Sequence, residues 1–103
     1  MYYIYIMSTE PDNIRNPCVK CLENMVKMAV VDDKPIMMDY WVDSLSGRAV
    51  IGVRESGEKL LVKSEDEYTS PIGKIYKVET DYIILTENSI YVVSTDIQSK
   101  RIS

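Results

Sequence analysis

Cys18 and Cys21, the two cysteines of the chain, are its clearest candidates for chemistry because they stand three positions apart at the start of a helical pattern. A cysteine in the first turn of a helix lies near the positive end of the helix dipole, which favours the thiolate and lowers the pKa of the thiol. The spacing also allows the second thiol to resolve a mixed disulfide formed on the first. A redox dithiol is therefore one interpretation of the pair.

The segment that follows the cysteines is predicted to be an amphipathic helix that runs to about Val31. Asn16 suits the capping position, and Pro17 suits the first helical position. The pattern ends before Pro35, because the residue that precedes a proline avoids the helical region. One stripe of the helix is polar, formed by Lys20, Glu23, Asn24 and Lys27. The opposite, core-facing stripe is expected to contain Val19, Leu22, Met25, Val26 and Ala29.

The helical wheel bears on the role of the cysteines. With Leu22 at the centre of the apolar face, Cys18 lies about 40° from the centre and Cys21 about 100° from it. A nucleophilic first cysteine should be the more exposed of the two, so this order favours packing over redox chemistry, and free cysteine is often fully buried. Two cysteines without histidine also supply only half of a four-ligand zinc site, unless a dimer joins two pairs. We therefore expect packed thiols, with no metal and no cofactor.

The order of an apolar run at residues 2–7, a loop, the Cys-x-x-Cys motif and a helix loosely resembles the opening of the thioredoxin and glutaredoxin family. The resemblance implies a proline that faces the dithiol, for which Pro71 is the candidate. It also implies a parallel strand after the helix and a helix at the end of the domain. Strand-like runs instead continue along the rest of this chain, so the resemblance covers only these segments.

The composition excludes several classes of function. Histidine is absent from the 103 residues, which removes Ser-His-Asp and Cys-His catalysis as well as histidine metal ligation. The formal net charge of −4 disfavours binding to a phosphate backbone, so a nucleic acid is not an expected partner. No glycine-rich loop joins a strand to a helix in a nucleotide-binding pattern. No signal peptide or membrane-spanning run is recognisable, so we expect a cytoplasmic protein that does not bind membranes.

Short strand-like runs occupy the chain after the helix. They lie at residues 36–43, 48–54, 59–63, 74–79, 82–86 and 90–94. A hairpin is expected around Gly57, and the last three runs are expected to form an antiparallel meander because their links are short. Residues 95–103 are interpreted as a flexible polar tail. The expected fold is a single α+β domain over residues 1–103, in which one N-terminal amphipathic helix packs on a mostly antiparallel, strongly twisted or barrel-like sheet of six or seven strands.

Aromatic residues on these strands point to an interaction function. Trp41 and Tyr40 are the preferred contact residues, with Asp39 and Asp43 beside them on the predicted strand at residues 36–43. Tyrosine and tryptophan are enriched at protein interfaces, and exposed strand edges pair readily. We therefore expect a non-catalytic module that binds another protein or a second copy of itself through an aromatic sheet face or an edge strand. The alternative is a thiol–disulfide protein or redox switch that uses Cys18 and Cys21.

Overall fold

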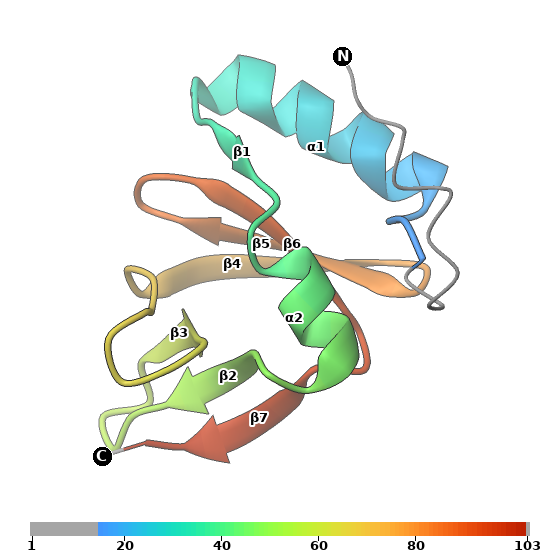
Figure 1. The fold of residues 1–103 in the computed structure, drawn as a ribbon. Coiled ribbons are helices and arrows are strands. Elements are labelled where there is room, and N and C mark those ends of the chain that lie inside the picture. Colours follow the sequence, from blue (N-terminus) through green and yellow to red (C-terminus); the bar gives the residue numbers. More distant parts are fainter. Residues whose placement is uncertain (1–14, 103) are drawn as a thin grey trace.

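The computed structural model describes residues 15–102, which form an α+β arrangement (Figure 1). Its helices are α1 (Val19–Asp32) and α2 (Trp41–Ser46). Its strands are β1 (Ile36–Met37), β2 (Val50–Val53), β3 (Lys59–Val62), β4 (Ile72–Val78), β5 (Asp81–Thr86), β6 (Ile90–Ser94) and β7 (Gln98–Arg101). The α+β class is thus confirmed, whereas the strand predicted at residues 2–7 lies outside the described residues.

The seven strands form two mixed sheets, which do not close into a barrel. The larger sheet has the order β1-β6-β5-β4, in which β1 runs parallel to β6 and the other neighbours are antiparallel. The smaller sheet has the order β3-β2-β7, in which β7 runs parallel to β2. The expected single, mostly antiparallel sheet is therefore replaced by two sheets, each of which gains a parallel strand from a distant part of the chain.

The larger sheet is the central layer of the structure, with α1 on one face and the smaller sheet on the other (Figure 1). Ile83 and Val92 pack toward α1, in the same buried cluster as Met25. Ile84 and Val93 point to the other face and belong to the cluster beneath the smaller sheet. Because β5 and β6 are buried on both faces, their sequences are nearly continuous apolar runs.

The local strand pairings follow the sequence prediction. β2 and β3 form an antiparallel hairpin whose turn contains Gly57 at a φ of 93°, a backbone conformation that glycine adopts without steric cost. β4, β5 and β6 form the antiparallel meander. Both predictions are confirmed because short links leave neighbouring strands few other ways to pair.

The strand predicted at residues 36–43 is wrong beyond Met37. The chain instead begins α2 at Trp41, and α2 ends at Ser46, followed by the C-cap Gly47, whose φ of 85° suits a helix C-terminus. Trp41 and Ser44 are both buried, three positions apart on one side of this short helix. Only three residues of the predicted strand, 41–43, belong to α2, and so short a run does not distinguish a helix from a strand by its pattern.

The segment expected to be a polar tail contains β7. All four residues of β7 are exposed, yet its backbone pairs in parallel with β2, from Val50 opposite Gln98 to Val53 opposite Arg101. Ile102 extends the pairing, since its N–H donates to the carbonyl of Val53 at 2.9 Å. Backbone hydrogen bonds require no apolar side chains, so the polar sequence of this segment carried no apolar pattern that would predict a strand.

Candidate functional site

The two cysteines lie at the start of α1 in the order that a redox pair requires. Cys18, not Asn16, is the N-cap of α1, and its sulfur accepts a hydrogen bond from the N–H of Cys21 at 3.3 Å. Cys18 is half-buried, whereas Cys21 is fully buried in the core beside Met25. The order that the helical wheel predicted is therefore reversed.

The helical-wheel prediction of which cysteine is buried was wrong because Leu22 is not at the centre of the core-facing side of α1. Val19 and Val26, which were expected to face the core, are 70% and 55% exposed, while α1 buries Cys21 and Met25 completely. Leu22 is only half-buried, at the boundary between the two sides. The core-facing line of α1 is thus rotated away from the valines and toward the cysteines.

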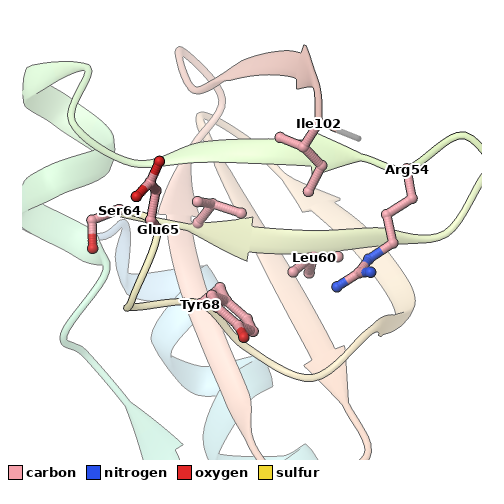
Figure 2. A pocket seen from close by; sticks show the side chains of 7 residues that line it. Arg54, Leu60, Ser64, Glu65, Tyr68 and Ile102 are labelled. Carbon is pink, nitrogen blue, oxygen red and sulfur yellow. The ribbon is translucent and has the colours of Figure 1, made fainter.

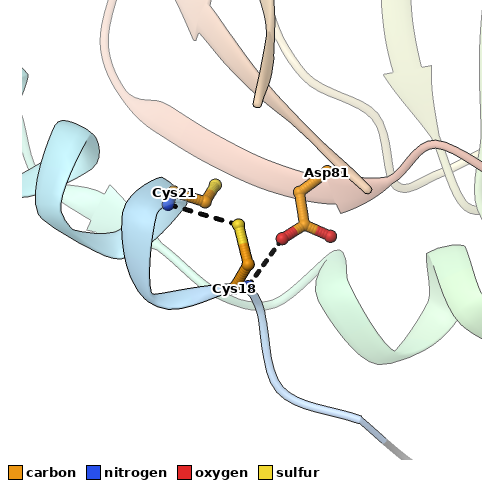
Figure 3. Close-up of side chains that lie close together, drawn as sticks. All are labelled: Cys18, Cys21 and Asp81. Carbon is orange, nitrogen blue, oxygen red and sulfur yellow. Dashed lines mark hydrogen bonds between the residues drawn. The ribbon is translucent and has the colours of Figure 1, made fainter. Parts of the chain in front are cut away.

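Asp81, the first residue of β5, holds the start of α1 against the central sheet (Figure 3). Its side chain is completely buried, and its Oδ2 accepts a hydrogen bond from the N–H of Cys18 at 2.7 Å. The thiol of Cys18 in turn donates to the carbonyl of Val78 at 3.7 Å. The two sulfurs and a carboxylate oxygen of Asp81 all lie within 4.8 Å of one another.

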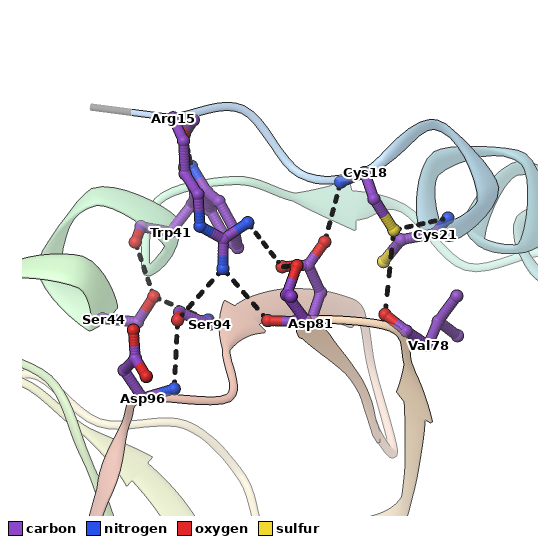
Figure 4. Close-up of polar contacts among 10 residues, drawn as sticks. Arg15, Cys18, Cys21, Trp41, Ser44, Val78, Asp81, Ser94 and Asp96 are labelled. Atoms are coloured by element: carbon purple, nitrogen blue, oxygen red, sulfur yellow. Dashed lines mark hydrogen bonds and ion pairs between the residues drawn. The ribbon is translucent and has the colours of Figure 1, made fainter. Parts of the chain in front are cut away.

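Arg15 supplies the counter-charge for this buried carboxylate (Figure 4). Its Nη1 lies 2.9 Å from Oδ1 of Asp81, and its Nη2 donates to the carbonyl of Thr80 and the hydroxyl of Ser94. The guanidinium carbon also lies 4.9 Å from the ring centroid of Trp41, in the range of a cation–π contact. An ion pair between two residues distant in sequence therefore lies beside the dithiol.

Trp41 lies against Arg15 of this ion pair and is not an exposed contact residue. Only 4% of its surface is exposed, and its Nε1 donates to the carbonyl of Arg15 at 2.7 Å. The hydroxyl of Ser44 donates to the carbonyl of Trp41 and accepts from the N–H of Ser94, which joins α2 to β6. Trp41 thus braces the segment that leads into α1.

The other predicted contact residues are separated from Trp41. Tyr40 is also 4% exposed and packs edge-on against Tyr91, with 5.5 Å between the ring centroids, in the cluster under the smaller sheet. Asp43 forms an ion pair with Lys63 at 3.3 Å, whereas Asp39 is exposed. The four residues therefore do not form one exposed aromatic face.

Burial keeps both thiols protonated. Burial and, to a smaller extent, the negative charge of Asp81 together raise the pKa of Cys21 from 9.0 to about 12, although the positive charge of Arg15 lowers it. The pKa of Cys18 is also raised, first by burial and then by Asp81 and Glu79, although the hydrogen bond from the N–H of Cys21 lowers it. At neutral pH both side chains are therefore mainly thiols, which react slowly with electrophiles.

The raised pKa of Cys21 predicts a loss of stability in alkali. The folded state holds this proton more tightly than the unfolded chain, so the stabilising contribution is complete below pH 9 and is lost as the pH rises to about 12. Denaturant titrations across this interval should show a falling free energy of unfolding. The fall should be shallower in Cys21→Ala. Tyr40→Phe should also show a shallower fall, because burial also raises the pKa of Tyr40 to about 12. An unchanged slope in both variants would contradict the assignment of the alkaline instability to these two groups.

Cys18, Cys21 and Asp81 are also the described side chains that could hold a metal ion. Tetrahedral zinc takes four ligands in structural sites, so these three leave the set one short. Both carboxylate oxygens of Asp81 already accept hydrogen bonds, and the positive charge of Arg15 lies beside them. The arrangement therefore suits a neutral thiol pair or a disulfide better than a cation.

The proline expected from the thioredoxin resemblance does not face the dithiol. Pro71 is exposed and directly precedes β4, whereas Cys18 contacts Val78 at the other end of that strand. Sequence reasoning also missed Arg15 and Asp81 altogether. A polar residue beside a predicted turn and a basic residue before a helix are both ordinary, so no sequence signal marked them.

A separate depression lies on the smaller sheet (Figure 2). Its volume is about 420 Å³, and it is lined by Arg54, Leu60, Val62, Ser64, Glu65, Tyr68 and Ile102. Ile102 closes over Gly52 so tightly that a Cβ there would lie 2.7 Å from its Cδ1. Arg54 pairs with Glu58 at 3.5 Å, so the basic side chain of this lining already has a counter-charge.

Comparisons of the chain with known protein families, with curated proteins and with solved structures found no match. Neither helix in residues 15–102 is long and apolar enough to cross a membrane.

Proposed function

We propose that the chain is a thiol–disulfide protein whose Cys18 and Cys21 interconvert between dithiol and disulfide. The observation that carries the proposal is the order of exposure: the half-buried Cys18 caps α1, and the fully buried Cys21 lies one turn later with its N–H bonded to the sulfur of Cys18. An incoming disulfide can reach the first sulfur, while the second is close enough to resolve the product.

The proposed reaction is a balanced two-electron exchange with a low-molecular-weight disulfide, such as oxidised glutathione. The thiolate of Cys18 attacks one sulfur of that disulfide, whose S–S bond breaks, and the leaving thiolate takes up a proton. Cys21 then loses its proton and attacks the sulfur of Cys18, which releases the second thiol. The protein dithiol is oxidised to a disulfide, and the external disulfide is reduced to two thiols.

The raised pKa of both thiols supports a slow switch rather than a fast catalyst. The thiolate is the attacking species, so its small population at neutral pH limits the rate of exchange. The rate should therefore rise with pH. The proposal includes a cytoplasmic location, where free cysteines are kept reduced and cysteine pairs serve in redox sensing.

Incubation with oxidised glutathione tests the proposal. We expect the intact protein to lose two hydrogen atoms in mass spectrometry and both cysteines to become resistant to alkylation. Cys21→Ser should stop at a mixed disulfide on Cys18, whereas Cys18→Ser should remain unmodified, since Cys21 is buried. The proposal fails if Cys18 stays a free thiol after long incubation, or if Cys18→Ser is modified as readily as Cys21→Ser.

We also propose a protein-binding function, on a different surface from the one expected. Val19, Val26 and Val30 of α1 are 70%, 55% and 75% exposed, and exposed apolar side chains that lie together are typical of interaction sites. The edge strand β4 is less suited to this role. Its exposed Ile75 and Tyr76 lie between Lys74 and Lys77, and lysines on an edge strand oppose pairing with another strand.

A further inference from the structure

Val19, Leu22, Val26 and Val30 form a continuous ridge on α1, termed here the valine stripe. Their spacing of three, four and four residues places them on one side of the helix. Three of them line a shallow groove together with Glu23 and Lys27. Leu22 also packs against the core, but the three exposed valines lower helix propensity and so cost α1 stability without adding to the core.

We propose that a second copy of this chain covers the valine stripe, with the two α1 helices packed antiparallel about a two-fold axis. The inference rests on the proposed protein-binding function and names its partner. An axis that crosses the stripe at the level of Asn24 and Met25 places Val19 of one copy near Val30 of the other and Leu22 near Val26. The stripe is thus complementary to itself, as a two-fold interface requires.

The charges beside the stripe fit the same arrangement. Glu23 and Lys27 flank the same side of the stripe. In the antiparallel pair, Glu23 of each copy lies opposite Lys27 of the other, which gives two symmetric ion pairs. In a parallel pair the two-fold axis would place the Glu23 and Lys27 side chains of the two copies on opposite flanks of the interface, where these ion pairs could not form. Because the stripe is short, the interface falls at the small end of the size range for specific complexes, and the dimer should be weak and concentration-dependent.

Sedimentation of the full chain over a range of concentrations tests the dimer with matched variants. Val26→Asp should weaken association at least about tenfold. Val31→Asp makes the same change on the same helix but off the stripe, where Val31 is 81% exposed, and should leave association unchanged. Glu23→Lys and Lys27→Glu should each weaken the dimer, and the double variant should restore it. A wild-type chain that stays monomeric at about 1 mM, or equal effects of Val26→Asp and Val31→Asp, would overturn the dimer.

A photo-reactive amino acid at position 26, compared with one at position 31, separates failure of the dimer from failure of protein binding. In extract of the native cells, a crosslink from position 26 to a second copy supports the dimer. A crosslink from position 26 alone to a different protein overturns the dimer but leaves the protein-binding function in place. A crosslink to residues 1–14 of the same chain, or no crosslink that depends on position 26, overturns both.

Discussion

Replacing Asp81 with asparagine is expected to lower the free energy of unfolding by about 3 kcal/mol, because it removes one partner of a buried ion pair. The carboxylate is completely buried and binds both Arg15 and the N–H of Cys18. Arg15 retains 36% exposure and can turn toward water, which places the loss at the lower end of the range for such pairs. Denaturant titration measures the change.

The same variant should make Cys18 react at lower pH. The charge of Asp81 contributes to the raised pKa of both thiols, so its removal lowers both values and increases the thiolate population near neutral pH. The alkylation rate of Cys18 should therefore reach its midpoint at a lower pH. The pH midpoint, unlike the rate itself, separates a change in pKa from faster local opening.

Asp43→Asn is the matched control for both effects. Asp43 pairs with Lys63 at a partly exposed site, where an ion pair contributes at most about 1 kcal/mol. It lies outside the set of groups that shift the pKa of either cysteine. A folded Asp81→Asn protein whose alkylation midpoint does not move, or moves to higher pH, would refute the role of the Asp81 charge.

Trp41→Ala is expected to lower the free energy of unfolding by about 3–5 kcal/mol, the usual loss for a large buried aromatic side chain. The indole is buried in the α1 cluster and lies against the guanidinium of Arg15. Its removal leaves a cavity and also frees the segment that leads to Cys18. We therefore expect faster alkylation of Cys18 in this variant, measured beside thermal unfolding.

Trp41→Phe isolates the contribution of the indole hydrogen bond, and Tyr68→Ala is the control at an exposed aromatic residue. Phenylalanine keeps most of the ring but removes the hydrogen bond to the carbonyl of Arg15, which should cost about 1 kcal/mol. Tyr68 is 56% exposed, so its truncation should change stability by less than about 0.5 kcal/mol. If Trp41→Ala were as mild as Tyr68→Ala, Trp41 would not be the brace that its contacts indicate.

The elements with strong local signals were predictable from sequence. α1 ends near Pro35, the hairpin turns around Gly57, and the meander follows from short links between apolar runs. In each case neighbouring residues determine the structure. α2 and β7 were missed because their stabilising contacts come from distant segments: Trp41 is held by Arg15, and β7 pairs with β2 through its backbone.

The candidate site was only half predictable. The sequence identifies Cys18 and Cys21, but not which is exposed, because α1 carries apolar residues on both its core side and its solvent side. Counting the exposed valines Val19 and Val26 as core residues therefore placed the predicted centre of the core face on the wrong side of α1. Asp81 and Arg15 lie 66 residues apart, and the pairing of two charged side chains over such a separation leaves no periodic pattern.

The parallel strand pairs have a consequence for how the protein folds. Ile36 pairs with Ile90, Val50 pairs with Gln98, and the amide of Cys18 reaches a side chain 63 residues further along the chain. Contacts between such distant segments form late, because the chain must first close large loops. Cys21 should therefore remain open to alkylation in the early stages of folding and become inaccessible only when the last loops close. The rate at which Cys21 becomes protected from alkylation during refolding would therefore measure the rate of the final folding step.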